Sequence, residues 1–203
     1  MKREPLMMLM LAFAGTSPTH AASRADATVA IRTYNYAQVS TERLATARTT
    51  ADRIFHDAGI SLEWIDCRVP QSESGAACTT PLSEGRDLAL RLRESAQDDS
   101  GNTTRIFALG TSMIDRERGG GVMMTVDVSA IRTIVGTTLL DVSAVLGRAI
   151  AHEIGHLLLG TPDHPTGGLM RARWSQDELR GLKPSHWRFS SREAAQMLRR
   201  IGR

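Results

Sequence analysis

At 203 residues the chain has the length of one globular domain, and its 41% hydrophobic and 23% charged residues are ordinary for such a domain. The formal net charge is +3, but the basic residues are scattered among acidic ones, and aromatic residues make up only 4%. Because a nucleic-acid-binding protein gathers its basic side chains on one face, this composition excludes nucleic acid as an expected partner.

The first 22 residues differ in character from the rest of the chain. A charged start, MKREP, precedes the apolar run LMMLMLAFAG and the small-residue segment TSPTHAA. This order is typical of a secretory signal peptide, and the apolar run is too short to span a bilayer. We therefore predict a signal peptide over 1–22, cleaved after Ala21 or Ala22, and one domain over 23–203. The mature protein is expected to be secreted or periplasmic, with no membrane association and with its oligomeric state left open.

A strand, a helix and a second strand are predicted at the start of the mature chain. Residues 27–37 mix β-branched and aromatic side chains in loose alternation, which is typical of a strand. Ser40 offers a helix N-cap, apolar residues recur at helical spacing over 41–58, and Gly59 is placed to end the helix. Residues 60–67 resemble a second strand. A strand–helix–strand unit of this length predicts a parallel pair.

The two cysteines, Cys67 and Cys78, flank a loop rich in proline, glycine and serine. In an exported protein such a pair most simply forms a disulfide that closes the loop. Their separation matches no zinc-binding cysteine spacing. We therefore predict a disulfide here in preference to a metal site, with two unpaired cysteines as the alternative if the protein is not exported.

Further along, strands are predicted over 87–93, 104–111 and 121–131, with the polar, glycine-rich residues 112–121 as a loop. From residue 141 the apolar spacing becomes helical, and Gly160 is a natural terminator.

Two short helices are predicted near the C-terminus, because Ser175 with Glu178 and Ser190 with Glu193 each match the Ser-x-x-Glu capping box. Taken together, the elements predict an α+β fold. It consists of a mixed β-sheet with one helix packed on it, a long helix, and small C-terminal helices.

The long helix carries the sequence HEIGH. A four-residue step along an α-helix goes about 40° past one full turn, so His152 and His156 project from the same side and can bind one ion. Glu153 lies about 100° round the helix from His152, too far to bind that ion but well placed to reach a water held on it. Two imidazole ligands and a nearby carboxylate are the parts of an HExxH zinc site.

The surroundings of the motif argue against a chance occurrence. Its flanks, RAIA and LLL, are apolar, so unpaired histidine and glutamate side chains on this helix would be costly to bury. Gly155 in the helix interior costs about 1 kcal/mol relative to alanine. We therefore expect another group to approach the helix backbone closely at this glycine.

The segment AHEIGHLLLG, with a third histidine and GLM after it, resembles the metzincin clan of zinc metallopeptidases. The pattern of that clan is H-E-x-x-H-x-x-G-x-x-H followed by a methionine-containing turn. The resemblance implies a zincin-like fold and Zn²⁺ as cofactor. It also implies that the strand before the active-site helix, here GVMMTVDV over 121–128, forms an edge that pairs with extended substrate. The implied roles are metal ligands at His152, His156 and His164, general base at Glu153, helix end at Gly160, and Met-turn at Met170.

The spacing departs from the clan pattern, with three residues instead of two on each side of Gly160. One extra helical residue turns the exit of the chain by about 100°. A left-handed glycine can redirect it, and four extended residues reach up to about 13 Å. We therefore predict His164 as the third ligand, with Asp163 and then Glu178 as alternatives. Glu178 is expected to be engaged with Ser175 in the capping box.

These observations predict a secreted zinc metalloendopeptidase whose partner is a peptide or protein substrate. Zinc would lower the pKa of a bound water to roughly 7, and Glu153 would accept the proton as the water attacks the peptide carbonyl. Two alternatives stay open. One is a zinc hydrolase of a non-peptide substrate, and the other is a secreted binding module whose zinc site is structural or inactive.

Overall fold

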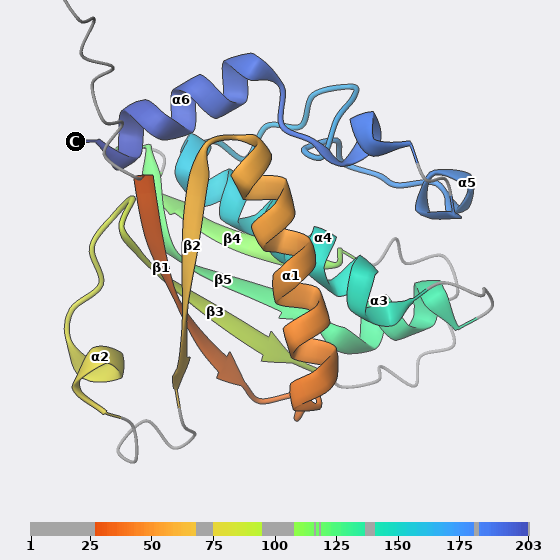
Figure 1. Cartoon of the computed structure of the whole chain (residues 1–203), viewed down its shortest axis with the longest axis horizontal. Helices are drawn as coiled ribbons and strands as arrows, with labels where there is room; N and C mark the ends of the chain where they lie inside the picture. The colour runs from red at the N-terminus through yellow and green to blue at the C-terminus, as the bar shows by residue number, and fades with distance from the viewer. Residues whose placement is uncertain are drawn as a thin grey trace, which may run out of the picture.

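A computed structural model describes residues 27–67, 75–94, 108–115, 117, 119–136, 141–180 and 183–202. The predicted signal peptide lies outside these residues. Within them, a five-stranded mixed sheet forms the centre of the fold, in the order β2-β1-β3-β5-β4 (Figure 1). β4 pairs antiparallel with β5, and the other neighbouring strands are parallel. The strands are β1 (Ala27–Asn35), β2 (Ile60–Cys67), β3 (Asp87–Arg93), β4 (Gly110–Asp115) and β5 (Gly120–Asp127).

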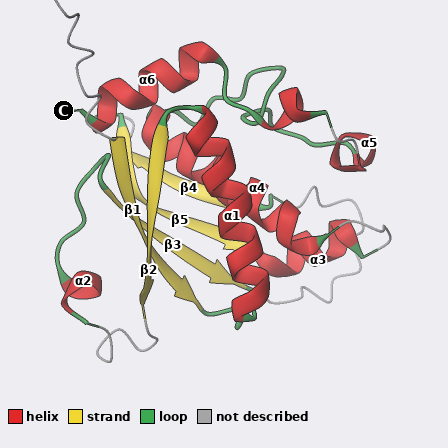
Figure 2. Ribbon diagram, viewed as in Figure 1, coloured by secondary structure: helices red, strands yellow, loops and turns green. Residues whose placement is uncertain are grey.

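Helices cover one face of this sheet, and Figure 2 shows α1 and α4 lying across it. α6 packs against α4 and crosses one end of the sheet. These elements together confirm the predicted α+β fold. The helices are α1 (Thr41–Asp57), α2 (Ala76–Thr79), α3 (Val128–Val135), α4 (Val142–Leu159), α5 (Gln176–Arg180), the 3₁₀ helix η2 (Pro184–Trp187) and α6 (Ser191–Ile201).

The first strand–helix–strand unit forms as the sequence predicts. The Ser40 side chain accepts a hydrogen bond from the backbone N–H of Arg43, and Gly59, with φ of 77°, follows the end of α1. β1 and β2 pair in parallel along their whole length. The apolar side of α1 is buried against α4 and the sheet, with Phe55 fully buried. Burying a side chain of that size contributes roughly 1.5–3 kcal/mol.

In the second half of the sheet, three predictions about strand positions are wrong. Residues 112–115, expected in a loop, belong to β4. Of the strand expected over 104–111, only residues 110 and 111 are strand, and residues 104–107 lie outside the described part. The strand expected to continue to residue 131 ends at Asp127, whose side chain caps α3 instead. β5 lies between β3 and β4, so it is an inner strand, and the edge strand on this side of the sheet is β4.

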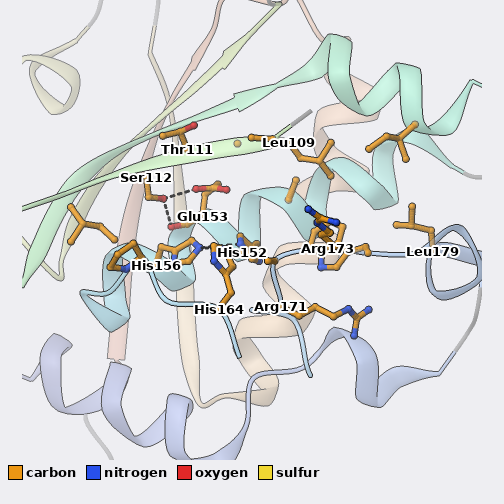
Figure 3. Close-up of a pocket in the computed structure, with 18 residues that line it drawn as sticks. Leu109, Thr111, Ser112, His152, Glu153, His156, His164, Arg171, Arg173 and Leu179 are labelled. Atoms are coloured by element: carbon orange, nitrogen blue, oxygen red, sulfur yellow. Dashed lines mark hydrogen bonds between the residues drawn. The ribbon is translucent and has the colours of Figure 1, made fainter. Parts of the chain in front are cut away.

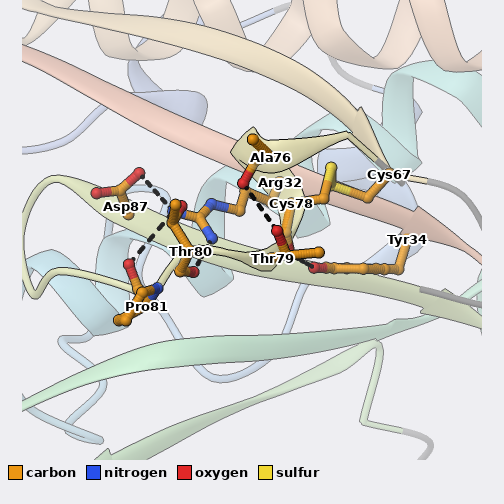
Figure 4. Close-up of polar contacts among 9 residues, drawn as sticks. All are labelled: Arg32, Tyr34, Cys67, Ala76, Cys78, Thr79, Thr80, Pro81 and Asp87. Carbon is orange, nitrogen blue, oxygen red and sulfur yellow. Dashed lines mark hydrogen bonds and ion pairs between the residues drawn. A yellow bond between two sulfur atoms is a disulfide. The ribbon is translucent and has the colours of Figure 1, made fainter. Parts of the chain in front are cut away.

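The predicted disulfide between Cys67 and Cys78 is present, and it ties the end of β2 to α2 on the face of the sheet away from α1 (Figure 4). The Tyr34 hydroxyl donates to the carbonyl of Cys78 at 3.1 Å. Arg32 is buried beside it, where its guanidinium donates to the carbonyl of Thr80 at 2.5 Å and pairs with Asp87 at 3.2 Å. These contacts anchor the segment after the disulfide to β1 and β3.

α4 is apolar nearly all the way round, and most of its residues are buried between the sheet, α1, α3 and α6. Among the described helices, α4 is long and apolar enough to cross a membrane, but buried core helices have the same length and composition. A helix that is hydrophobic on all sides is expected in a core. The motif therefore lies on a helix that is buried in the core.

Candidate metal centre

The described structure brings the three histidines into one cluster. His152 and His156 project from α4, and His164 reaches them from the segment that follows the helix. The Nε2 atom of His156 lies 3.0 Å from Nε2 of His152 and 3.1 Å from Nε2 of His164. Within the described residues these three histidines form the group whose donor atoms lie close enough to hold one metal ion.

Gly160 makes this return of the chain possible. It ends α4 in the left-handed conformation, with φ of 69°, and its N–H donates to the carbonyl of His156. A Cβ at this position would come within 1.8 Å of the carbonyl oxygen of Gly119. Both the backbone conformation and the close neighbour therefore require glycine, and the conformation turns the following residues back toward the helix.

Backbone carbonyls fix the orientation of the two helix histidines. Nδ1 of His152 lies 3.0 Å from the carbonyl oxygen of Leu169, and Nδ1 of His156 lies 2.8 Å from that of Thr161. Because a carbonyl only accepts, each Nδ1 must carry the hydrogen and donate it. In the neutral rings Nε2 is then unprotonated, with its lone pair directed into the cluster. Metal-binding histidines are typically held in this way.

The electrostatics of the cluster fit a cation. Burial lowers the pKa of His152 to about 4 and also lowers the pKa of His156. Both rings are therefore neutral at pH 7, as coordination requires. Neutral rings that bring Nε2 lone pairs within about 3 Å repel one another unless a positive charge lies between them. Three imidazole nitrogens are a donor set that suits Zn²⁺.

Glu153 lies on the same helix and is held by β4. The Ser112 hydroxyl lies 2.7 Å from Oε2 of Glu153 and 2.9 Å from its backbone carbonyl, and it can donate to either (Figure 3). A Cβ at Gly110 would come within 2.7 Å of Oε1 of Glu153, so the strand leaves space for the carboxylate at that point. Burial raises the pKa of Glu153 to about 7, and the hydrogen bond from Ser112 acts in the opposite direction.

The close approach expected at Gly155 is confirmed. A Cβ there would meet the sulfur of Met170 at 2.6 Å and the ring of Phe189 at 2.8 Å. Met170 is fully buried and follows Leu169, whose carbonyl orients His152. The segment containing Met170 thus forms a packed base beneath the helix that carries the histidines.

The two alternative ligands lie outside the histidine cluster. Asp163 is exposed, and its backbone N–H donates to the Thr161 hydroxyl at 3.1 Å. Glu178 forms the expected capping box, because its Oε2 accepts from the N–H of Ser175 at 2.8 Å, and it also pairs with Arg171 at 3.2 Å. The hydrogen bond from the Ser175 backbone is the main reason that the pKa of Glu178 is lowered.

A cleft of about 620 Å³ opens beside the cluster (Figure 3). Leu109 and β4 form one side, and the histidines with Glu153 form another. The segment after Met170 contributes Arg171, Arg173 and Trp174. Sequence reasoning missed Ser112 and Gly110, because their role depends on β4, and it assigned no role in the site to Arg173. A strand prediction over 110–115 would have been needed to find the first two.

Solved structures share this fold, which confirms the predicted resemblance at the level of the fold. The structure is similar to a zinc-dependent peptidase from Methanocorpusculum labreanum, with a TM-score of 0.52 at 13% identity, covering 82% of this chain and 99% of that one. It is also similar to archaemetzincin from Methanopyrus kandleri, with a TM-score of 0.54 at 12% identity, covering 89% and 99%. No protein-family model matches the chain, and no curated protein matches its sequence.

Ser112 provides a test of how the site holds Glu153. If the site is hydrolytic, we expect Ser112→Ala to lower kcat for hydrolysis by roughly 10- to 100-fold with KM little changed, because losing one hydrogen bond to a charged group costs about 1.5–3 kcal/mol. Ser112→Thr, which keeps the hydroxyl, should recover most of the loss. Steady-state kinetics of zinc-replete proteins of equal zinc content measures both values. A fall in zinc content or a rise in KM alone would show a structural role for Ser112.

Proposed function

We propose that this chain is an exported zinc metalloendopeptidase. The observation that carries the proposal is the convergence of three imidazole Nε2 atoms beside an oriented, buried glutamate in an open cleft. The fold supports a zinc hydrolase, since one of the two similar structures is described as a zinc-dependent peptidase and the other as archaemetzincin. The disulfide supports export, because disulfides persist in oxidising compartments.

In this proposal His152, His156 and His164 hold the zinc, and Leu169 and Thr161 fix the two helix rings through their carbonyls. Bound zinc acts as a Lewis acid that polarises the scissile carbonyl and acidifies water. Glu153 accepts a proton from the water that attacks the carbonyl carbon. It then gives that proton to the amine nitrogen as the C–N bond breaks. Ser112 keeps the carboxylate directed for both transfers.

β4 favours a peptide over a non-peptide substrate. It is the edge strand next to the cleft, and within the described residues no further strand pairs with its outer side. An extended peptide can add to such an edge through backbone hydrogen bonds. β4 thus has the role of substrate-pairing edge that the sequence analysis assigned to residues 121–128. A strand-like mode of binding accommodates residues on both sides of the scissile bond, as an endopeptidase requires.

The direct test is digestion of casein or gelatin by zinc-replete protein comprising residues 23–203. We expect internal cleavage, seen by mass spectrometry, that stops with a zinc chelator and returns when zinc is added back. Hydrolysis of small esters or amides without any peptide cleavage would instead support the non-peptide hydrolase. Tight zinc binding with no hydrolysis would support the binding module.

A further inference from the structure

The charges lining the cleft are unequal. Glu153 is the one carboxylate among the described lining residues, whereas two arginines, Arg171 and Arg173, come from the segment after Met170. Much of the remaining wall is apolar, formed by residues such as Leu109, Ile134 and Leu179. A cleft with apolar walls and excess positive charge favours a ligand that carries negative charge.

Arg171 is already committed to the protein itself. It is buried, with 8% of its surface exposed, and its guanidinium pairs with Glu178 at 3.2 Å. It also lies over the ring of Trp187, 5.3 Å from the centroid. The carboxylate of Glu178 balances this charge locally. Arg171 therefore fixes the wall of the cleft and is not the group that remains available to a ligand.

Arg173 differs from Arg171 in every one of these respects. It is exposed and lines the cleft, and among the described residues it has no ion pair or hydrogen bond (Figure 3). The same wall contains Trp174, whose ring packs edge-on against His152, with 5.7 Å between ring centroids. Arg173 therefore lines the same cleft as the three histidines and Glu153, and its positive charge is available to a ligand bound in that cleft.

We propose that Arg173 binds a carboxylate of the substrate, so that the enzyme prefers peptides with a carboxylate near the scissile bond. The inference rests on the proposed peptidase function and adds a substrate class to it. Arginine suits this role because its planar guanidinium donates two parallel hydrogen bonds to a carboxylate. Two sources supply this chemistry, namely an aspartate or glutamate side chain and the C-terminal carboxylate of the peptide.

Binding is measured first, in zinc-replete Glu153→Gln protein, so that no substrate is consumed. Isothermal calorimetry compares three series of peptides built on one sequence. The first and second series are blocked at both ends and carry aspartate or asparagine, respectively, at each position in turn. The third series carries asparagine but has a free C-terminal carboxylate. We expect at least tenfold tighter binding of one carboxylate series. In the double variant Glu153→Gln/Arg173→Gln, the affinities for the carboxylate series and for the blocked asparagine series should differ by no more than about twofold.

The matched control is Arg192→Gln in the same background, because Arg192 is exposed on α6 outside the cleft. It should keep the full preference. Tighter binding of the aspartate series identifies a side-chain carboxylate as the bound group, whereas tighter binding of the peptides with a free C-terminus identifies the α-carboxylate. Equal or undetectable binding of the paired peptides, or a preference that survives Arg173→Gln, overturns the inference.

The parent enzyme separates this inference from the proposed function. Peptide cleavage without a carboxylate preference removes the role of Arg173 and leaves the peptidase in place. A carboxylate preference in binding without cleavage of any peptide removes the peptidase and leaves a zinc protein that recognises carboxylates at Arg173.

Discussion

Glu153→Gln is expected to reduce peptide hydrolysis by about a thousandfold while zinc content stays at the level of the parent. General acid–base catalysis contributes typically 10²–10⁴ in rate, and an amide neither accepts nor returns the proton. Glu153 is absent from the group of side chains that can hold the ion, so its replacement removes no ligand. The amide oxygen can still accept the hydrogen bond that Ser112 now donates at 2.7 Å, which preserves the local packing. Initial rates and zinc analysis of the same preparation measure the two effects.

Glu42→Gln is the matched control, because Glu42 is exposed in the first turn of α1. It should show the activity of the parent and the same zinc content. Full activity of Glu153→Gln would remove the general base from the mechanism. Loss of zinc together with activity would show instead that Glu153 supports the metal site, and the catalytic role would then need a different residue.

The parts of the fold that the sequence predicts well are those where local pattern and tertiary packing agree. Ser40 and Gly59 mark the ends of α1, and apolar spacing places its buried face. The histidines of α4 share one side because helical geometry alone sets their separation. Elements of this kind satisfy local propensity, capping and burial at once, and sequence patterns are most reliable in that case.

β4 was missed because the active site shapes its sequence. A strand that packs on a helix usually directs bulky apolar side chains toward it, but here Gly110 and Ser112 meet the carboxylate of Glu153. One is small enough to make room and the other donates a hydrogen bond. The strand therefore lacks the β-branched alternation that identifies a half-buried strand. Because Gly110 and Ser112 serve the contact with Glu153, the alternating pattern that would have predicted a strand is absent from β4.

The error at the end of β5 has a different cause. Val128 and Ile131 are β-branched and continue the apolar run of the strand, but Asp127 caps a helix by accepting from the N–H of Ala130. A single capping side chain thus decides where the strand ends. The position of β5 within the sheet also depends on pairing between distant segments, which no local pattern specifies. The edge was therefore assigned to the wrong strand.

The third ligand is the part of the site that the sequence left open. Helical geometry fixes His152 and His156, whereas the path from Gly160 to His164 depends on a left-handed turn and on the hydrogen bond from His156 to Thr161. His164 is exposed, and its Nε2 lies 3.1 Å from that of His156. If it completes a zinc site, removing it should weaken metal binding far more than removing any carboxylate nearby.

His164→Ala is accordingly expected to weaken zinc binding by on the order of 100-fold or more, since replacing residues that merely support a ligand already costs 10–100-fold. Parent protein should hold one zinc per chain. A 100-fold excess of zinc over its Kd should stabilise it by about 2.7 kcal/mol and raise its Tm, and a chelator should reverse this. In the variant, most of that Tm increase should be lost at the same zinc concentration.

Three further variants make the result specific. His56→Ala, on the exposed side of α1, should match the parent in zinc content and in the Tm increase. Asp163→Ala and Glu178→Gln should also keep zinc, because neither side chain belongs to the histidine cluster. Zinc retained in His164→Ala but lost in one of these two would move the third ligand to that carboxylate. It would also separate this site from the three-histidine pattern that the sequence resembles. No zinc in the parent under metal-replete conditions would contradict the zinc centre itself.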